Sequence, residues 1–485
     1  MEFAHFFEEF APILMFLALA LLLFSGFPVA FILAGIGLGF AFMGDYMEVM
    51  SIGKLNLLPL RIFGGVVESP VLVAIPMFIY MGTMLERSGV AKDLLYALQV
   101  LTRRIPGGLA LSITIMGTIM AATTGIIGAS VVMMTLLALP IMLEQKYNVP
   151  LATGTIAASG TLGILIPPSI MLVIMADLME LSVGNVFVAA LFPGLMLAVF
   201  YMVYIVILCT VKPELAPPLA ADIGPKGRAE FWGMMARSFL PPVFLITLVL
   251  GSIFAGFATP TEAAGVGALG STILAAFKLR LSRKNLVAVC QSSAMTTAML
   301  FGIFLGATCF SLIFRTLGGE ELIKEIIVSF GQGPWTILFV LMGTIFLLGF
   351  FFDWIEITLI VLPVFGPVME NPDIVNLVSH VAPMVHADIA SGILSGIDAE
   401  KALEAAGQTQ LLWFTILIAV NLQTSFLTPP FGFALFYMKG VAPPEVKIQQ
   451  IYRGIIPFVI LQLIGLAMVI GFPGLALWLP SVLLE

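Results

Sequence analysis

SGTLGILIPPSIMLVIMA, residues 159–176, is the stretch that decides how the rest of the chain is interpreted. It is apolar enough to lie within a bilayer. Pro167 and Pro168 interrupt any helix there, because proline lacks an amide proton and clashes with the preceding turn. Backbone groups that lose their helical partners at membrane depth are tolerated only where they face protein or a polar cavity. The stretch therefore predicts a broken membrane helix over residues 150–176.

The same device recurs near the end of the chain. Residues 423–439 read QTSFLTPPFGFALFYMK, with another Pro-Pro pair inside a membrane-length apolar run. They predict a second broken helix over residues 411–438. Two broken segments at corresponding places in two halves indicate the binding site of a secondary transporter.

The composition is that of a membrane protein with many spans. Of the 485 residues, 60% are hydrophobic and only 10% are charged. Apolar runs of about 20 residues, the length that one helical span needs, recur from end to end. The sequence shows no β-barrel alternation, no basic patch for nucleic acid and no cysteine spacing for disulfides or zinc. We expect an all-α polytopic protein in the lipid bilayer, with about 10–11 spans.

The chain divides into two repeats. A shift of 262 residues superposes the two Pro-Pro pairs, and a shift of 223 superposes Ser130 on Asp353. Small or polar residues interrupt an apolar hairpin in each repeat, at TTGIIGAS and at GFFFDWIE. The predicted order is repeat one (1–211) with scaffold spans, a re-entrant hairpin (107–143) and the broken helix 150–176, then a cytoplasmic linker (212–237), then repeat two (238–485) with a hairpin (333–369), a polar insert (370–410) and the broken helix 411–438.

Lysine and arginine predict the orientation. If residues 107–143 form a hairpin that returns to its own side, five polar segments share one side, and these hold 16 of the 21 lysines and arginines. That side is expected to be cytoplasmic, because cytoplasmic loops carry the excess of positive charge. The second repeat is then inverted relative to the first. The five segments are 87–104, 144–149, 212–237, 278–285 and 439–453.

Four motifs in order resemble the large membrane subunit (permease, DctM-type) of tripartite ATP-independent periplasmic (TRAP) transporters: ATTGIIGASVVMM, ASGTLGILIPPSI, FATPTEAAGVGAL and NLQTSFLTPPFG. The resemblance covers essentially the whole chain. It implies an inverted-repeat ion-transporter fold with a scaffold, two re-entrant hairpins and two broken helices. It also implies sodium-driven, elevator-type uptake of organic acids through a bacterial or archaeal cytoplasmic (inner) membrane. The implied partners are a small four-span membrane subunit and a periplasmic substrate-binding protein.

The sequence departs from the family pattern at two places. Many members carry an acidic residue shortly after the tip of the first hairpin, whereas VVMMTLL follows Ser130 here. The insert at 370–410 is also longer than in the compact members.

Unwound membrane backbone supplies carbonyl oxygens to sodium ions, which need about five or six oxygen ligands. We expect two or more coupling sodium ions, held where each hairpin tip meets its broken helix. The alternative is that the glycines and hydroxyls only permit close packing of helices. The expected ligands are Gly128, Ser130, Ser159, Gly160 and Gly163 at the first site and Gly349, Asp353, Thr424 and Thr428 at the second.

Three acidic residues carry separate expectations. Asp353 is an ionisable group in an apolar hairpin, where charges are costly and usually paired or functional. A tip near the outer interface would instead leave it solvated. Glu356 follows three residues later and is either a partner of Asp353 or interfacial. Glu262 is interpreted first as a helix-start acid.

The organic-acid substrate needs donor groups. No arginine or lysine lies within the two predicted broken helices, so half-helix N-termini and hydroxyls are expected to bind the anion. The candidate substrate-binding residues are Thr123, Thr124, Ser130 and Ser169.

Other functions are less consistent with the sequence. A stand-alone sodium/carboxylate symporter of a related inverted-repeat superfamily remains the alternative, and a channel is conceivable. An intramembrane enzyme is disfavoured, because there is no HExxH motif and no Ser–His pair within the predicted spans. No Walker A motif supports ATP-driven transport.

Overall fold

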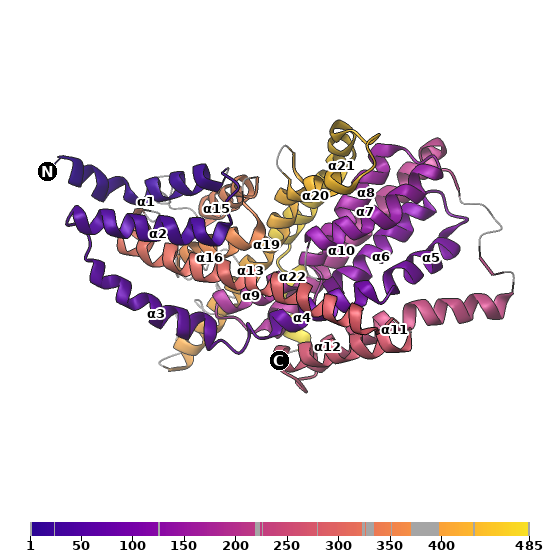
Figure 1. The fold of residues 1–485 in the computed structure, drawn as a ribbon, viewed down its shortest axis with the longest axis horizontal. Helices are drawn as coiled ribbons and strands as arrows, with labels where there is room; N and C mark the ends of the chain where they lie inside the picture. The colour runs from indigo at the N-terminus through magenta and orange to yellow at the C-terminus, as the bar shows by residue number, and fades with distance from the viewer. Residues whose placement is uncertain are drawn as a thin grey trace. The chain divides into compact units, whose positions relative to one another are not determined.

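The computed structural model describes residues 2–23, 25–124, 127–218, 224–225, 227–278, 280–322, 325, 334–350, 352–369, 397–429 and 432–483. Throughout these residues the regular structure is helical, which confirms the all-α prediction (Figure 1). Seven helices of the described part have the length and composition of a membrane span: Val29–Tyr46, Ile127–Glu144, Val183–Val211, Arg228–Phe254, Arg283–Thr316, Glu404–Leu427 and Ile448–Gly471. Shorter apolar helices accompany them: Glu9–Leu23, Gly108–Met120, Val149–Ile164, Trp335–Leu348 and Gly474–Leu483.

The chain folds into two compact units, and each takes segments from both predicted repeats. Unit 1 comprises Met1–Leu72, Leu178–Glu180 and Met295–Phe414. Unit 2 comprises Val73–Asp177, Leu181–Ala294 and Thr415–Glu485. The two units therefore do not coincide with the two predicted repeats. The repeat boundary at the linker 212–237 stays a prediction from the sequence.

In unit 1, small residues let two long helices approach closely. Helix α1 (Glu2–Leu23) packs on α2 (Val29–Tyr46), and α2 packs on the later part of α13 (Arg283–Thr316). A Cβ atom at Gly306 of α13 would collide with the backbone of Ala30. The short segments η1 (Ile52–Asn56), α3 (Leu57–Ile62) and the π-helical turn η2 (Phe63–Val67) follow α2.

Unit 2 is a bundle around α6 (Gly108–Thr124), α7 (Ile127–Glu144) and α8 (Val149–Thr161), which all contact one another. Figure 1 shows several of its helices side by side. Helix α8 also packs against α21 (Ile448–Gly471), and both helices have a glycine at the contact. A Cβ atom at Gly154 would collide with Gly454 O. Unit 2 also contains α4 (Ala74–Arg87), α5 (Val90–Thr102), α9 (Ile170–Leu178), α10 (Val183–Val211), α11 (Arg228–Phe254), α12 (Pro260–Phe277), α20 (Phe433–Val441), α21 (Ile448–Gly471) and α22 (Gly474–Leu483), with the short turns η3 (Leu162–Ile164) and η4 (Pro213–Leu215). The start of α13 and the end of α19 (Ile397–Leu427) belong to it as well.

Helices α6 and α7 form the first predicted hairpin. The amide of Leu109, at the start of α6, donates a hydrogen bond to Tyr147 Oη after the end of α7, at 3.2 Å. Burial raises the pKa of Tyr147 to about 12, so this phenol stays neutral at physiological pH. The two outer ends of the hairpin thus lie together. This is the arrangement on which the orientation argument depends.

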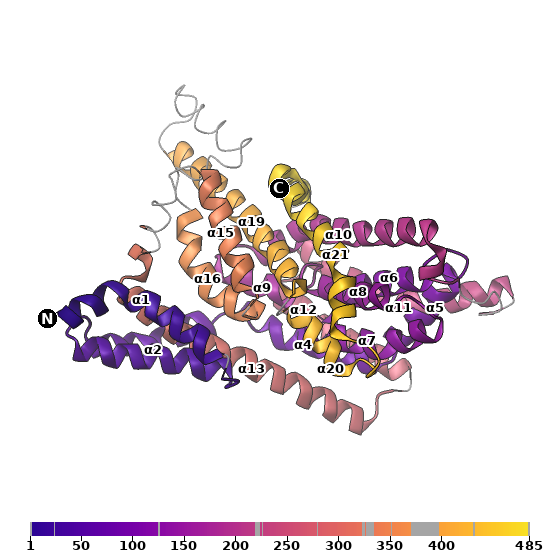
Figure 2. The ribbon, with the colours of Figure 1, turned by 90° about the horizontal axis from the view of Figure 1, so that it is seen from above.

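The second hairpin and both helix breaks also occur near the expected residues. Helices α15 (Pro334–Leu348) and α16 (Trp354–Met369) are neighbours in unit 1 (Figure 2). The first break separates α8 from α9. The second separates α19 (Ile397–Leu427) from α20.

Two helices begin earlier than the sequence pattern predicted. Helix α11 begins at Arg228, inside the predicted linker, and α19 begins at Ile397, inside the predicted insert. The start of α19 reads IDAEKALEAAGQTQ, which is rich in strong helix formers despite its polarity. Polarity was therefore a poor guide to where this helix starts. Residues 370–396 of the predicted insert lie outside the described residues.

Candidate functional site

The first hairpin and the first broken helix meet through small residues, and the predicted sodium site at this contact stays a prediction. A Cβ atom at Gly160 would lie 2.6 Å from Val131 Cγ2 and 3.3 Å from Val131 N. A Cβ atom at Gly117 of α6 would lie 2.8 Å from Ser159 Cβ. Both neighbours would have to shift, so these glycines are needed for the contact. Ser130, Ser159, Gly160 and Gly163 are all buried here.

The hydroxyls of the first break donate to protein groups. Ser159 Oγ donates to Thr114 Oγ1 at 3.3 Å, and Ser169 Oγ donates to Ile164 O at 2.6 Å. Ser169 therefore satisfies a carbonyl that the break removes from the helical ladder. Its predicted role as a donor to the substrate stays a prediction.

The tip of the first hairpin also contacts the second broken helix, which the sequence reasoning missed. A Cβ atom at Gly128 would lie 3.1 Å from Tyr437 Cζ in α20. Helix α7 thus packs against both broken helices in unit 2. Thr123 and Thr124 end α6, and their side chains lie outside the described residues.

The second group of predicted ligands is divided between the units. Gly349 and Asp353 belong to unit 1, whereas Thr424 and Thr428 belong to unit 2. Their assembly into one sodium site stays a prediction.

Asp353 starts helix α16 together with Glu356. Asp353 Oδ1 accepts a hydrogen bond from Trp354 N at 2.8 Å. Glu356, in the first turn, is 5% exposed, and its Oε2 has no hydrogen-bond partner among the described residues. A buried acceptor of this kind is costly unless a donor or a cation satisfies it.

Thr424 and Thr428 both hydrogen-bond back to their own helix. Thr424 Oγ1 donates to Val420 O at 3.1 Å, and Thr428 Oγ1 donates to Thr424 O at 2.8 Å. A hydroxyl that donates its proton to a carbonyl keeps its lone pairs. Both threonines can therefore still offer an oxygen to a cation.

Gln423 is a candidate that the sequence reasoning missed. Its side chain is fully buried, and its Oε1 and Nε2 have no hydrogen-bond partner among the described residues. The available signal was a carboxamide at the start of QTSFLTPP, inside an apolar run. One carboxamide offers both an acceptor for a cation and donors for an anion.

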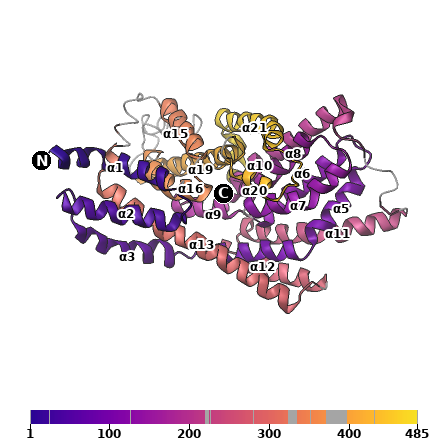
Figure 3. The ribbon, with the colours of Figure 1, turned by 45° about the horizontal axis from the view of Figure 1, so that its top comes forward.

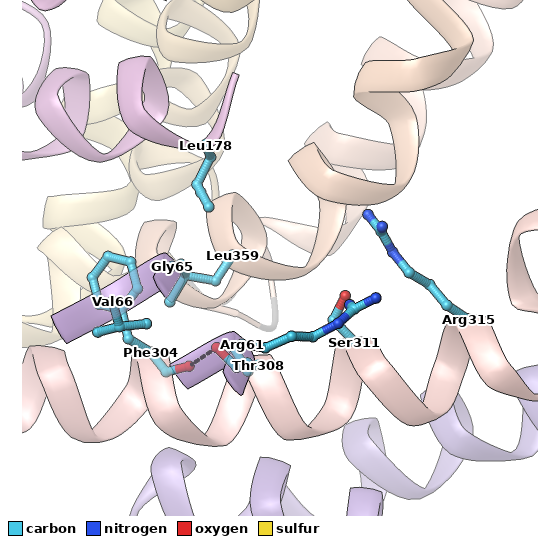
Figure 4. Close-up of a pocket in the computed structure, with 10 residues that line it drawn as sticks. Arg61, Gly65, Val66, Leu178, Phe304, Thr308, Ser311, Arg315 and Leu359 are labelled. Atoms are coloured by element: carbon cyan, nitrogen blue, oxygen red, sulfur yellow. Dashed lines mark hydrogen bonds between the residues drawn. The ribbon is translucent and has the colours of Figure 1, made fainter. Parts of the chain in front are cut away.

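Unit 1 contains a pocket of about 360 Å³ with two guanidinium groups at its wall (Figure 4). Arg61 comes from α3, and Ser311 and Arg315 lie one turn apart on α13. Arg315 Nε lies 3.1 Å from Glu320 Oε1. In Figure 4 the Arg61 side chain runs along α13 toward Ser311. The pocket offers a positive charge and a hydroxyl, the pair that binds a carboxylate.

Glu262 has the structural role that its position predicted. Its carboxylate accepts a hydrogen bond from Thr259 N at 2.8 Å, and its amide donates to Thr259 Oγ1 at 3.3 Å. This capping box starts α12.

Comparison with known proteins decides the family. The family model "Tripartite ATP-independent periplasmic transporter, DctM component" matches residues 16–475. The chain belongs to this family. The predicted resemblance to the TRAP large subunit is thereby confirmed, and the family consists of transporters and not enzymes. The chain is a multi-pass membrane subunit of a tripartite system.

Individual relatives differ in the substrate that they are named for. The chain is 30% identical over 415 residues to the C4-dicarboxylate TRAP transporter large permease protein of Pseudomonas aeruginosa, covering 85% of this chain and 87% of that one. It is 27% identical over 462 residues to the ectoine TRAP transporter large permease protein of Halomonas elongata, covering 94% and 96%.

A solved structure is similar in fold. The crystal structure of the Alcanivorax borkumensis YdaH transporter, described as having an unusual topology, matches with a TM-score of 0.56 at 14% identity. The match covers 87% of this chain and 88% of that one. This likeness supports the transporter fold.

Proposed function

We propose that this TRAP large subunit imports organic acids by sodium-coupled, elevator-type transport through a bacterial or archaeal cytoplasmic membrane. In this proposal it works with a small four-span subunit and a periplasmic substrate-binding protein. Two or more sodium ions bind where the hairpins meet the broken helices.

The observation that carries sodium coupling is the pair of acids at the start of α16. The buried Oε2 of Glu356 lacks a partner among the described residues, and the half-buried Asp353 lies one turn before it. A bound cation would satisfy this unpaired carboxyl oxygen. In unit 2, the broken helix that ends at Leu427 offers hydroxyl oxygens of its own at Thr424 and Thr428.

The organic-acid class is supported by the pocket in unit 1. Arg61 and Ser311 face it, and both can donate to a carboxylate. The predicted broken helices contain no such cation, so this pocket supplies the positive charge that the sequence argument lacked. The elevator movement is supported by the division into two units, each built from both repeats.

The test is uptake into proteoliposomes that contain this chain, the small subunit and the binding protein. A panel of mono- and dicarboxylates is supplied with an inward sodium gradient, with an equal potassium gradient, and with neither. We expect uptake of at least one carboxylate with the sodium gradient alone. Equal uptake with potassium would contradict sodium coupling. Robust uptake by the isolated chain would favour the stand-alone symporter.

A further inference from the structure

A basic pocket in unit 2 is separate from every residue that the proposed function uses. It has a volume of about 470 Å³ and lies between the end of α4, the start of α5, the middle of α11 and the end of α12. Figure 3 shows α11 and α12 side by side. Its wall carries four cations, which are Lys92, Arg237, Lys278 and Arg280.

The cations outnumber the acids at this pocket. Lys278 Nζ forms an ion pair with Asp93, the one acid that lines it. Lys92, Arg237 and Arg280 make no ion pair in the part of the chain that the structure describes. Glu230 lines the neighbouring hollow. Even with Glu230 included, the two hollows keep a net positive charge, which suits a phosphate group.

Apolar side chains continue from the pocket along the two helices. Phe277 at the end of α12 is 81% exposed, and it lines the pocket. On α11, Leu240 is 66% exposed and Phe244 is 63% exposed. Leu240 and Phe244 lie on the two turns of α11 that follow Arg237. They offer acyl chains an apolar surface directly beside the cations.

The cations of this pocket come from segments that are predicted to lie at the cytoplasmic membrane surface, where lipid headgroups are found. The pocket lies at the end of α4, the start of α5 and the end of α12, beside the middle of the long apolar helix α11. Its cations come from three predicted cytoplasmic segments: 87–104, 212–237 and 278–285. Basic pockets between membrane helices on that side suit anionic headgroups.

We propose that this pocket binds the phosphate headgroup of an anionic phospholipid, whose acyl chains lie along α11 and α12. Lys92, Arg237 and Arg280 contact the phosphate, while the Lys278–Asp93 pair holds α12 to α5. The proposal is independent of sodium coupling and of the transported substrate.

The test measures thermal unfolding of the whole chain in lipid nanodiscs. Nanodiscs of phosphatidylcholine are compared with nanodiscs that contain added phosphatidylglycerol, and with phosphatidylcholine nanodiscs in inorganic phosphate. The test variant is K92Q/R237Q. The control variant is R228Q/K284Q, which removes the same charge from exposed positions outside the pocket.

Phosphatidylglycerol should raise the Tm of the parent and of the control variant. In K92Q/R237Q, the concentration of phosphatidylglycerol that gives half of this rise should increase about thirtyfold. Each basic residue near an anionic lipid surface strengthens binding about five- to sixfold, and this variant removes two. An equal loss in both variants would mean non-specific charge attraction and would overturn the proposal. A full rise with inorganic phosphate alone would assign the pocket to a free anion, which also overturns it.

Discussion

The two hairpin-and-break motifs share a sequence pattern but differ in what their polar groups contact. In the first motif every residue from 151 to 176 is buried, and Ser159 and Ser169 donate to protein oxygens. In the second, Gln423 and Glu356 keep buried polar atoms without partners among the described residues. Thr155 Oγ1 in the first motif also has no partner among the described residues. The first motif therefore leaves one buried hydroxyl unpaired, whereas the second leaves a carboxamide and a carboxylate oxygen. We infer that the second carries most of the sodium coupling.

Replacing Asp353 should have the largest effect. Asp353→Asn removes a charge at the start of α16, so we expect the sodium concentration for half-maximal uptake to rise roughly ten- to hundredfold, equivalent to about 1.5–3 kcal/mol. The measurement is uptake by the reconstituted tripartite system over a range of sodium concentrations. Glu262→Gln is the control, since Glu262 caps a helix. A similar rise in that variant would assign the effect to general loss of acid.

A pair of glycine substitutions tests packing in the two hairpins. Gly117→Ala should destabilise the protein by about 1–3 kcal/mol, because the new Cβ atom would overpack Ser159. Gly343→Ala in α15 meets nothing within 4 Å and should be neutral or stabilising by up to about 1 kcal/mol. Thermal unfolding in detergent checks both. Equal losses of stability in the two variants would show that the two hairpins do not differ in how tightly they pack at these glycines.

Thr428→Val tests a hydroxyl at the second break. Its loss should raise the half-maximal sodium concentration about three- to tenfold, equivalent to about 0.7–1.4 kcal/mol. Thr153→Val is the matched control, because Thr153 Oγ1 makes the same bond to the carbonyl four residues earlier, Val149 O, in α8. Should both variants shift the sodium dependence equally, the effect would come from helix geometry and not from coordination.

Ser169→Ala should have the smallest effect on transport. It leaves Ile164 O without its 2.6 Å hydrogen bond, so stability should fall by about 1 kcal/mol. The half-maximal sodium concentration should not change. A changed sodium dependence with unchanged thermal stability would place Ser169 in a sodium site. It would contradict the proposed difference between the two breaks.

The sequence predicted the helix breaks because their causes are local. Pro167, Pro168 and the pair at 429–430 fix where the backbone cannot continue as a helix. The hairpin tips were predictable because the small and polar residues that interrupt each apolar run are also local features of the sequence. The membrane class and the family followed from composition and from four short motifs.

Long-range packing could not be predicted in the same way. The contact of Gly128 with Tyr437 joins the two repeats, and nothing near either residue signals it. The division into two units also depends on contacts between distant segments. Gln423 was missed because a buried unpaired carboxamide is recognised only once its surroundings are known.

Direct binding of sodium tests the central claim without any partner. The measurement is the Tm of the isolated chain in sodium chloride and in potassium chloride at equal ionic strength, because an ion that binds only the folded state raises Tm. We expect sodium to raise the Tm of the parent and of Glu262→Gln, which changes a helix cap outside the proposed sites, and to raise it much less in Asp353→Asn and Thr428→Val. The same rise in all four proteins, or an equal rise with potassium, would contradict a sodium site at the second break.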